Sequence, residues 1–204
     1  MKIGIINYQA CNLKSIYSTV YNLGYDPIII ENKIDFLNIN KIIIPGVGSA
    51  KHCIDYLQKK KIFEEIIKFK NLGMPILGIC LGMHLFAEKL FEHGESQGFG
   101  FIKGEVIPLT MNSKFNIGWH KLKINKTENR FIKKINNDAT FYFCHSYYFN
   151  ISQSNSEYSI ATVNLDKEVP SIICKDNILG VQFHPERSQN HGVNFIENFI
   201  KNFQ

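Results

Sequence analysis

Length, composition and charge limit the classes to which the protein can belong. The chain has 204 residues, of which 45% are hydrophobic and 20% are charged, which excludes disordered and fibrous proteins and predicts one globular domain over residues 1–204. Its net charge of +5 comes from lysines spread along the chain without a recognised nucleic-acid-binding motif, so nucleic acid is not an expected partner.

The N-terminus and the cysteines indicate the compartment. No apolar run approaches the ~20 residues that span a bilayer, and residues 1–7 carry no signal peptide, so no membrane association is expected. Scattered cysteines without a CxxC pair fit a reducing compartment and support neither disulfides nor a metal site. We therefore predict a cytoplasmic protein in which four of the five cysteines are small buried side chains. The five are Cys11, Cys53, Cys80, Cys144 and Cys174.

The first 90 residues alternate between strand-like and helical patterns. Short apolar runs predict strands at 2–6, 27–30, 42–44 and 75–79. Apolar residues at helical spacing predict helices over 13–23, which Gly24 would terminate, within 54–69, and again at 85–88. Because the strands are continuously apolar and are separated by helices, they predict a parallel sheet covered on both faces.

From about residue 100, short strand-like segments predominate. They lie at 105–109, 121–124, 140–144, 157–163, 169–174 and 178–183, and a final helix is predicted over about 190–203. The sequence shows no internal repeat and no linker. The expected fold is therefore α/β, with a mainly parallel sheet flanked by helices and an antiparallel extension in the second half.

Cys80 is the candidate nucleophile. It stands between Gly78 and Gly82, after the apolar run 75–77 and before a helical segment. A cysteine flanked by glycines at a strand-to-helix turn is typical of a nucleophile elbow, in which the tight turn leaves no room for neighbouring side chains and exposes the sulfur. A helix N-terminus directly after the cysteine favours the thiolate. Covalent catalysis is therefore the leading hypothesis.

His184 and Glu186 are the candidate partners of this nucleophile, which needs a base and a group that orients the base. Pro185 restricts His184 to extended backbone at the end of a predicted strand. Because side chains at i and i+2 of an extended segment point to the same side, Glu186 is expected beside His184. Alone, the pair also fits a strand-end histidine next to a surface glutamate. Together with the cysteine elbow it predicts a Cys80–His184–Glu186 triad.

Two backbone N–H groups are candidates for the oxyanion hole that acyl transfer requires. The elbow supplies the N–H of Leu81. A second could come from Val47 in Pro45-Gly46-Val47-Gly48, whose two glycines give the backbone freedom to present it. By local sequence alone, this segment fits a plain tight turn as well as an oxyanion loop. As a phosphate-binding loop it lacks the lysine and the full glycine pattern.

The segments around Cys80 and His184 resemble the two signatures of class I (triad) glutamine amidotransferases. The resemblance implies a flavodoxin-like three-layer fold and hydrolysis of L-glutamine to glutamate and ammonia through a thioester, without a cofactor. Cys80 would be the nucleophile, His184 the general base and acid, and Glu186 the orienting carboxylate. By the same resemblance, Gly48, Ser146 and Tyr147 would line the glutamine site. The two signatures read Gly78-Ile79-Cys80-Leu81-Gly82-Met83 and Gln182-Phe183-His184-Pro185-Glu186.

Further segments resemble one subgroup of this class, the glutaminase subunits of imidazole glycerol phosphate synthase. This resemblance covers essentially the whole chain and implies a heterodimer with a (β/α)-barrel cyclase subunit of histidine biosynthesis. The docking face would include Trp119, Tyr142 and Arg187. From the residues alone, the two aromatic side chains also fit a core and Arg187 a solvated cation. The segments are Tyr8 with Asn12-Leu13-Lys14-Ser15, the loop 45–48, Gly118-Trp119, 141–148 and Arg187-Ser188.

Three places depart from the family pattern. His84 stands where the family has a glutamine that helps to bind the substrate, four residues after Cys80 and hence on the same helix face. It could be a substitute contact to glutamine, a neutral packing residue or a sign of altered substrate handling. His120 replaces a usual asparagine, and residues 7–12 lack the usual Asp-Tyr followed by two glycines.

Three other functions are also compatible with the sequence, and the departures bear on the first of them. The chain could be a paralogous glutaminase that supplies ammonia to another synthase, such as a sugar amidotransferase of surface-polysaccharide biosynthesis. A cysteine hydrolase or peptidase of the same architecture is a third hypothesis, against which the His-Pro-Glu arrangement speaks. A non-catalytic binding module is a fourth, and the complete set of triad residues speaks against it.

Overall fold

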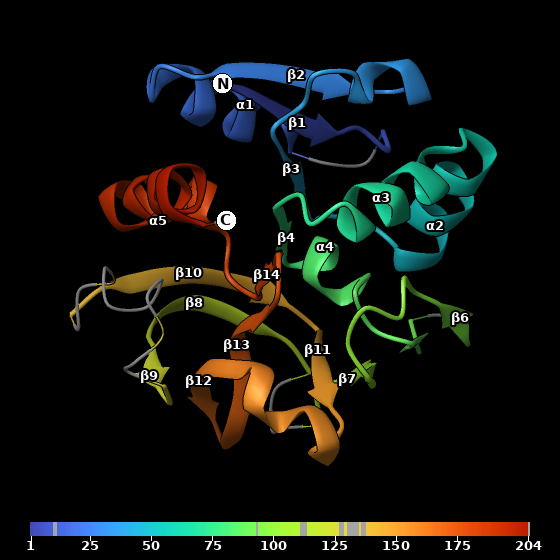
Figure 1. Ribbon diagram of the computed structural model, residues 1–204. Helices are drawn as coiled ribbons and strands as arrows, with labels where there is room; N and C mark the ends of the chain where they lie inside the picture. The colour runs from blue at the N-terminus through green and yellow to red at the C-terminus, as the bar shows by residue number, and fades with distance from the viewer. Residues whose placement is uncertain are drawn as a thin grey trace.

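An eight-stranded sheet forms the centre of the protein (Figure 1). The computed structural model describes residues 1–9, 12–92, 94–110, 114–126, 129, 135 and 138–203. The strands lie in the order β2 (Asp26–Ile30), β1 (Lys2–Ile6), β3 (Lys41–Ile44), β4 (Ile76–Ile79), β14 (Ile178–Val181), β13 (Lys167–Lys175), β12 (Ser159–Leu165) and β9 (Lys123–Ile124). The first five strands are parallel, in the order of a flavodoxin-like sheet, and the last three are antiparallel. The predicted α/β class is confirmed.

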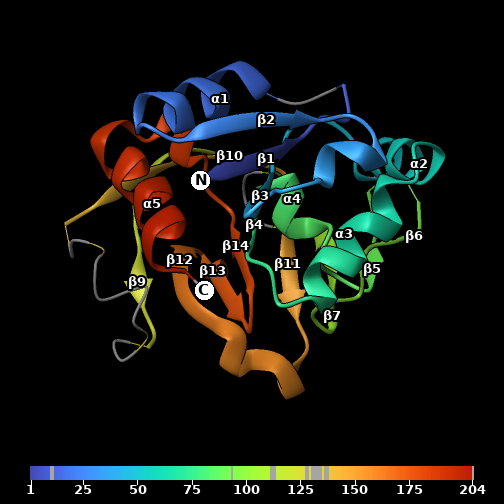
Figure 2. The same ribbon diagram turned by 45° about the horizontal axis from the view of Figure 1, so that its top comes forward.

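Helices cover both faces of the parallel strands (Figures 1 and 2). α1 (Leu13–Asn22) and α5 (Gln189–Asn202) lie on one face, and α2 (Ala50–Lys59) and α3 (Ile62–Asn71) lie on the other. Neighbouring side chains point to opposite faces, so Ile43 and Leu77 pack with the first pair of helices and Ile42 and Ile76 with the second. Burial on both faces is the reason why these strands are continuously apolar.

Two smaller sheets are formed by strands between residues 89 and 151. The sequence did not predict β8 because its polar Asn116 is buried, whereas Ile117 and Trp119 are exposed. That arrangement inverts the pattern by which an amphipathic strand is recognised. One sheet pairs β8 (Asn116–Lys121) with β10 (Thr140–His145), and the other holds β11 (Tyr147–Ile151), β7 (Gly104–Pro108), β5 (Lys89–Leu90) and β6 (Ser96–Gln97) in that order.

The helix after Cys80 lies earlier in the chain than predicted. α4 spans only Leu81–His84, so the prediction of a helix at 85–88 is wrong. The carbonyl oxygen of Leu85 accepts a hydrogen bond from the N–H of Phe99 at 2.7 Å, and the chain leaves the helical path there. The remaining short elements are the 3-10 helices η1 (Lys33–Phe36), η3 (Gln153–Tyr158) and η4 (Pro185–Arg187).

The structure describes four of the five cysteines. Cys53, Cys80, Cys144 and Cys174 are described, and none of these four is in a disulfide. Cys53 is buried in the core, as predicted, whereas Cys144 and Cys174 are only half-buried. Cys11 lies outside the described residues.

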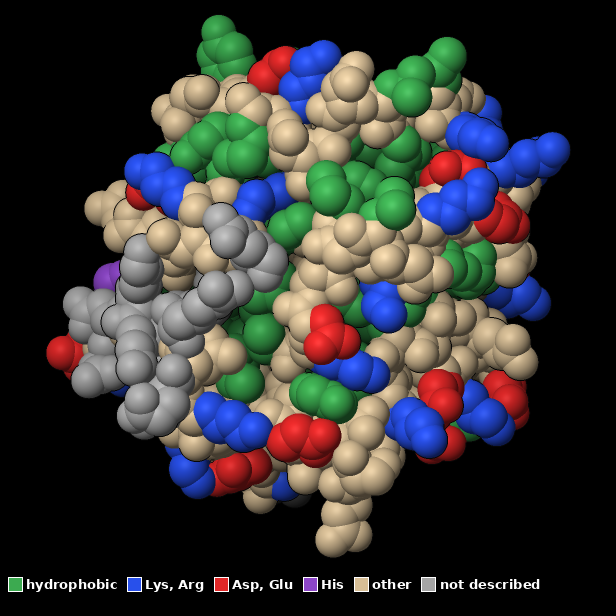
Figure 3. Space-filling model, in the orientation of Figure 1, with side chains coloured by type: hydrophobic (Ala, Val, Ile, Leu, Met, Phe, Trp, Pro, Cys, Tyr) green, Lys and Arg blue, Asp and Glu red, His purple; other side chains and the backbone are tan. Residues whose placement is uncertain are grey.

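The surface carries charges of both signs (Figure 3). On the face shown there, Lys and Arg side chains stand beside Asp and Glu side chains, so positive charge is dispersed on this face rather than gathered. Exposed ion pairs such as Lys89–Glu95 at 3.1 Å and Lys121–Asp138 at 2.9 Å contribute little to stability. Of the helices that the structure describes, none is long and apolar enough to cross a membrane.

The glycines around Cys80 are required by close backbone contact. A side chain at Gly78 would place its Cβ 2.6 Å from the backbone of Gly82, and a Cβ at Gly82 would overlap the carbonyl oxygen of Ile44. Gly46 is constrained in the same way, because its Cβ would overlap the carbonyl oxygen of Ile79. The prediction that both flanking glycines are needed at the elbow is confirmed, and these contacts lock the end of β3 against the end of β4.

We expect Gly82→Ala to lower the free energy of unfolding by about 3 kcal/mol, because the added methyl group meets rigid backbone. Gly24→Ala is the matched control: Gly24 has a φ of +82° and open space around it, so that variant carries only the backbone cost of about 1 kcal/mol. Urea denaturation measures both variants. Equal losses in the two would contradict the importance of the close contact.

Candidate active site

The ends of three parallel strands bring the predicted site residues together. β3, β4 and β14 are neighbours in the sheet, and parallel strands present their carboxyl ends at one edge. Val47 follows β3, Cys80 follows β4 and His184 follows β14. The N–H of Cys80 donates to the carbonyl oxygen of Val181 at 2.6 Å, which ties the elbow to β14. The triad is therefore assembled by strand pairing.

Cys80 has a strained backbone. Its φ of 49° and ψ of −105° lie in a region that residues other than glycine seldom adopt, at a cost of about 1–3 kcal/mol. The glycine contacts on both sides hold it there. α4 presents its first N–H groups next to the sulfur, but four residues generate little of the dipole of a longer helix. The predicted dipole contribution to thiolate formation is therefore smaller than expected.

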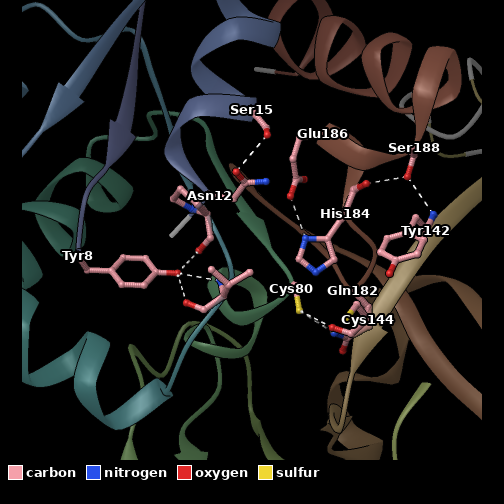
Figure 4. A network of polar contacts seen from close by, with 12 residues as sticks. Tyr8, Asn12, Ser15, Cys80, Tyr142, Cys144, Gln182, His184, Glu186 and Ser188 are labelled. Atoms are coloured by element: carbon pink, nitrogen blue, oxygen red, sulfur yellow. Dashed lines mark hydrogen bonds and ion pairs between the residues drawn. The ribbon is translucent and has the colours of Figure 1, made fainter. Parts of the chain in front are cut away.

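His184 and Glu186 form a buried pair beside Cys80 (Figure 4). The Nδ1 of His184 lies 2.9 Å from Oε1 of Glu186, and both side chains are at most 3% exposed. His184 is extended, as Pro185 predicted, but Glu186 reaches it through the 3-10 turn η4 and not along an extended strand. The other oxygen, Oε2 of Glu186, is buried and has no hydrogen-bond partner among the described residues.

The charge state of His184 follows from its neighbours. Burial by itself lowers the pKa of His184, but its hydrogen bonds to Cys80 and Glu186 and the negative charges of both groups outweigh burial and raise the pKa to about 10. His184 is therefore an imidazolium at neutral pH. Its Nδ1–H donates to Glu186, and its second ring N–H, on Nε2, is the proton available for transfer near the sulfur.

Hydrogen bonds from β10 hold the backbone of His184 (Figure 4). The N–H of His184 donates to the carbonyl oxygen of Tyr142 at 2.8 Å. The hydroxyl of Ser188 donates to the carbonyl oxygen of His184 at 2.7 Å and accepts from the N–H of Tyr142 at 2.9 Å. Ser188 is fully buried, so this clamp is shielded from water. The position of the triad histidine is thus coupled to β10.

A cavity of about 310 Å³ lies against Cys80. The predicted glutamine-site residues Gly48, His84, Ser146 and Tyr147 all line it. Among the residues that the structure describes, no group of three or more His, Cys, Asp and Glu side chains could hold a metal ion. The sequence analysis assigned no role to five further lining residues: Glu92, Phe115, Ile117, Cys144 and His145. Cys144 and His145 belong to the segment 141–148 that carries the resemblance, and no local motif marks the other three.

His145 links the cavity to the surface through a chain of hydrogen bonds. Burial lowers its pKa to about 3, so the ring is neutral. Its Nδ1–H donates to the carbonyl oxygen of Tyr147 at 2.8 Å, and its Nε2 accepts from the amide of Asn116 at 3.1 Å. The Oδ1 of Asn116 in turn accepts from Nε2 of His120 at 2.8 Å. His120, one of the departures from the family pattern, therefore lies one residue away from the cavity wall.

The two predicted oxyanion donors differ in their present contacts. Leu81 is the first residue of α4, so its N–H has no acceptor within the helix. The N–H of Val47 instead donates to the hydroxyl of Tyr8 at 3.3 Å, and that hydroxyl donates to the carbonyl oxygen of Pro45 at 2.8 Å (Figure 4). Val47 lines the cavity, but its N–H is engaged by Tyr8 and can serve an oxyanion there only when that hydrogen bond is broken.

His84 lies deep in the site. It is 5% exposed, and burial lowers its pKa to about 4 although a hydrogen bond to Gln182 acts in the opposite direction. Its Nε2 lies 2.8 Å from Oε1 of Gln182. Gln182 is fully buried, and its Nε2 lies 3.6 Å from the sulfur of Cys80. Sequence reasoning included Gln182 only as part of a signature and assigned it no role.

The three predicted interface residues lie at the surface or partly so. Trp119 is 46% exposed, which excludes the alternative that it is a core aromatic. Its ring packs edge-on against the half-buried ring of Tyr142, with 5.8 Å between centroids. Arg187 is exposed, next to the triad glutamate. Phe115 and Ile117 extend the exposed apolar row along β8 and were not predicted.

Comparison with known proteins gives consistent results. The family model described as "Glutamine amidotransferase class-I" matches residues 4–203. The chain is 39% identical to imidazole glycerol phosphate synthase subunit HisH of Caldanaerobacter subterraneus, over 97% of this chain and 96% of that protein. It is 40% identical to the subunit of the same name from Buchnera aphidicola, over 98% and 100%. A solved structure of PurLQS from Thermotoga maritima shares the fold, with a TM-score of 0.77, 18% identity and coverage of 100% and 99%.

We expect Glu186→Gln to lower the pKa of His184, because the variant removes a carboxylate charge from the imidazolium. NMR of the ring should show a wild-type histidine that stays charged between about pH 5 and pH 8, and a variant that titrates within that range. Because the pKa is raised in the folded state, the stability from this charge is complete below pH 6.5 and is lost as the pH rises through about 10.

The exposed Glu64→Gln is the matched control for this experiment, since Glu64 lies on α3 away from the site. It should leave the titration of His184 unchanged. Identical ring titrations in wild type and Glu186→Gln would contradict the assigned role of the carboxylate.

Proposed function

The chain belongs to the class I glutamine amidotransferase family, and on this basis we propose that it is the glutaminase subunit of imidazole glycerol phosphate synthase. It hydrolyses glutamine to glutamate and ammonia, and a cyclase subunit uses the ammonia to make imidazole glycerol phosphate and AICAR in histidine biosynthesis. Residues 1–204 act as one amidotransferase domain. The observation that supports this chemistry is the arrangement of Cys80, His184 and Glu186 next to a cavity of the size typical of small-molecule sites.

The first half of the reaction forms a thioester. The thiolate of Cys80 attacks the side-chain amide carbon of glutamine, and the carbonyl oxygen becomes an oxyanion. The imidazolium of His184 then gives its proton to the amide nitrogen, the C–N bond breaks, and ammonia leaves. Glu186 keeps the imidazole in the tautomer and orientation that this transfer needs. The neutral imidazole that results is ready to act as a base.

The second half hydrolyses the thioester. His184 takes a proton from water, the hydroxide attacks the thioester carbon, and glutamate leaves as the C–S bond breaks. The N–H of Leu81 stabilises both oxyanions, and the N–H of Val47 joins it once it is released from Tyr8. Because that second donor is engaged elsewhere, we expect the isolated subunit to be a weak glutaminase.

The cavity supplies polar groups for the two ends of glutamine. Glu92 is the one carboxylate among the described lining residues, and it is the natural partner of the α-ammonium group. Its Oε2 accepts the N–H of Ala50 at 2.7 Å, which fixes the carboxylate at the start of α2. Gly48, Ser146 and Tyr147 line the same space and orient the substrate through backbone and hydroxyl groups.

The partner in this proposal is a (β/α)-barrel cyclase, bound as a heterodimer at the face that contains Trp119, Tyr142 and Arg187. An exposed row of large apolar side chains is typical of a protein interface, and Phe115 and Ile117 continue that row to the cavity. Ammonia released at Cys80 would therefore leave beside the docked partner. We place this heterodimer in the cytoplasm, where cysteines stay reduced.

Glutamine-dependent synthesis tests this function. With a cyclase subunit and its nucleotide substrate, the wild-type protein should form imidazole glycerol phosphate and glutamate in equal amounts. Cys80→Ala should lower glutamine-dependent turnover by at least about 10³-fold while added ammonia still supports synthesis. Activity retained by Cys80→Ala would exclude the triad. Glutamine hydrolysis without imidazole glycerol phosphate would instead favour a paralogue that serves another synthase.

We expect Trp119→Ala to weaken cyclase binding by about 30-fold, the effect of losing one buried aromatic anchor of about 2 kcal/mol. Calorimetric titration of the subunit with the cyclase measures the change. Tyr21→Ala is the matched control, because Tyr21 is 65% exposed but lies at the end of α1 that leads into β2, at the opposite edge of the sheet. An unchanged affinity in Trp119→Ala would place the docking face elsewhere.

A further inference from the structure

We propose that His84 is a positioning residue that orients the side-chain amide of Gln182 so that it donates a hydrogen bond to the sulfur of Cys80. The proposal rests on the proposed function, because it gives that sulfur its catalytic task. It differs from the three interpretations of His84 that the sequence left open, because it assigns His84 an action on the nucleophile through a neighbouring side chain.

The contacts form a continuous buried series. Nε2 of His84 lies 2.8 Å from Oε1 of Gln182, and Nε2 of Gln182 lies 3.6 Å from Sγ of Cys80, within the range of an N–H···S hydrogen bond. The exposed fractions of the three residues are 5%, 0% and 7%. Water therefore has little access to replace either contact.

A thiolate at Cys80 fixes the direction of the series, because a thiolate can only accept a hydrogen bond. Gln182 then turns its NH₂ group to the sulfur and its Oε1 to His84, so Nε2 of His84 carries the proton. In the opposite orientation of the amide, its oxygen would face the negative sulfur. Burial keeps His84 uncharged, with a pKa of about 4, so it supplies a dipole and not a second positive charge. His84 thus selects the orientation in which Gln182 donates to Cys80.

This donor complements the imidazolium of His184. A buried thiolate is costly unless hydrogen bonds compensate its charge, and hydrogen bonds to charged groups contribute more than those between neutral groups. The positive charge of His184 and the N–H of Gln182 both stabilise a negative sulfur, while the carbonyl oxygen of Cys144 lies 3.9 Å from the sulfur. The buried Gln182 donor also restricts the position of the sulfur.

The test measures alkylation of Cys80 by iodoacetamide, followed by mass spectrometry at that residue over a range of pH. His84→Ala and Gln182→Leu should each slow alkylation about tenfold below neutral pH and lower kcat for glutamine, with a smaller change in KM. The double variant should be no slower than either single variant, because both remove the same hydrogen bond to sulfur. His84→Gln keeps an N–H donor and should restore alkylation to within about twofold of wild type.

Three results would overturn the proposal. The first is an unchanged alkylation rate in His84→Ala with only a higher KM. The second is additive effects of the two substitutions in the double variant. The third is a His84→Gln variant whose circular dichroism and thermal midpoint match wild type but whose alkylation rate is not restored. Alkylation needs neither glutamine nor the cyclase. A wild-type protein that hydrolyses no glutamine in the presence of the cyclase would therefore overturn the proposed function, while the alkylation rates would still decide the role of His84.

Discussion

Backbone contact without intervening side chains is the constraint on which the site depends. Gly46, Gly78 and Gly82 let the end of β3, the end of β4 and the start of α4 approach more closely than any Cβ would permit. That contact holds Cys80 in a conformation that costs free energy, and it sets the loop containing Val47 against the elbow. The surrounding β-branched core supplies the rigidity that keeps the strain from relaxing.

The second organising feature is the burial of charge around the nucleophile. Glu186 and His184 are removed from water and compensate each other, so the pair is stable only while its geometry is kept. Tyr142 binds the N–H of His184 and Ser188 binds its carbonyl oxygen, and these two hydrogen bonds keep that geometry. Since the ring of Tyr142 packs on the exposed Trp119, the same strand carries the proposed docking face and the support of the triad.

Some of this arrangement could be predicted from the sequence because it depends on local pattern. Strands buried on both faces are continuously apolar, and a Gly-x-Cys-x-Gly segment is sterically distinctive, so the parallel sheet and the nucleophile were both recognised. β8 was missed because its apolar side chains face outward, toward the surface proposed for a partner. The apolar pattern of residues 85–88 predicts a helix that does not form, and the competing hydrogen bond from Phe99 could not be predicted because it comes from a separate loop.

The chemical type of the protein follows from local sequence: a cysteine elbow, a histidine with its carboxylate two residues later, and a resemblance along the whole chain. The surroundings of the sulfur depend instead on contacts between distant segments. His84 and Gln182 lie 98 residues apart, and the pairing of β14 with β4 is what brings one beside the other. The direction in which Val47 presents its N–H depends likewise on Tyr8, a residue of another segment. Such contacts cannot be recognised from the sequence pattern, because a single hydrogen bond between residues far apart in the chain imposes no regular spacing on the residues.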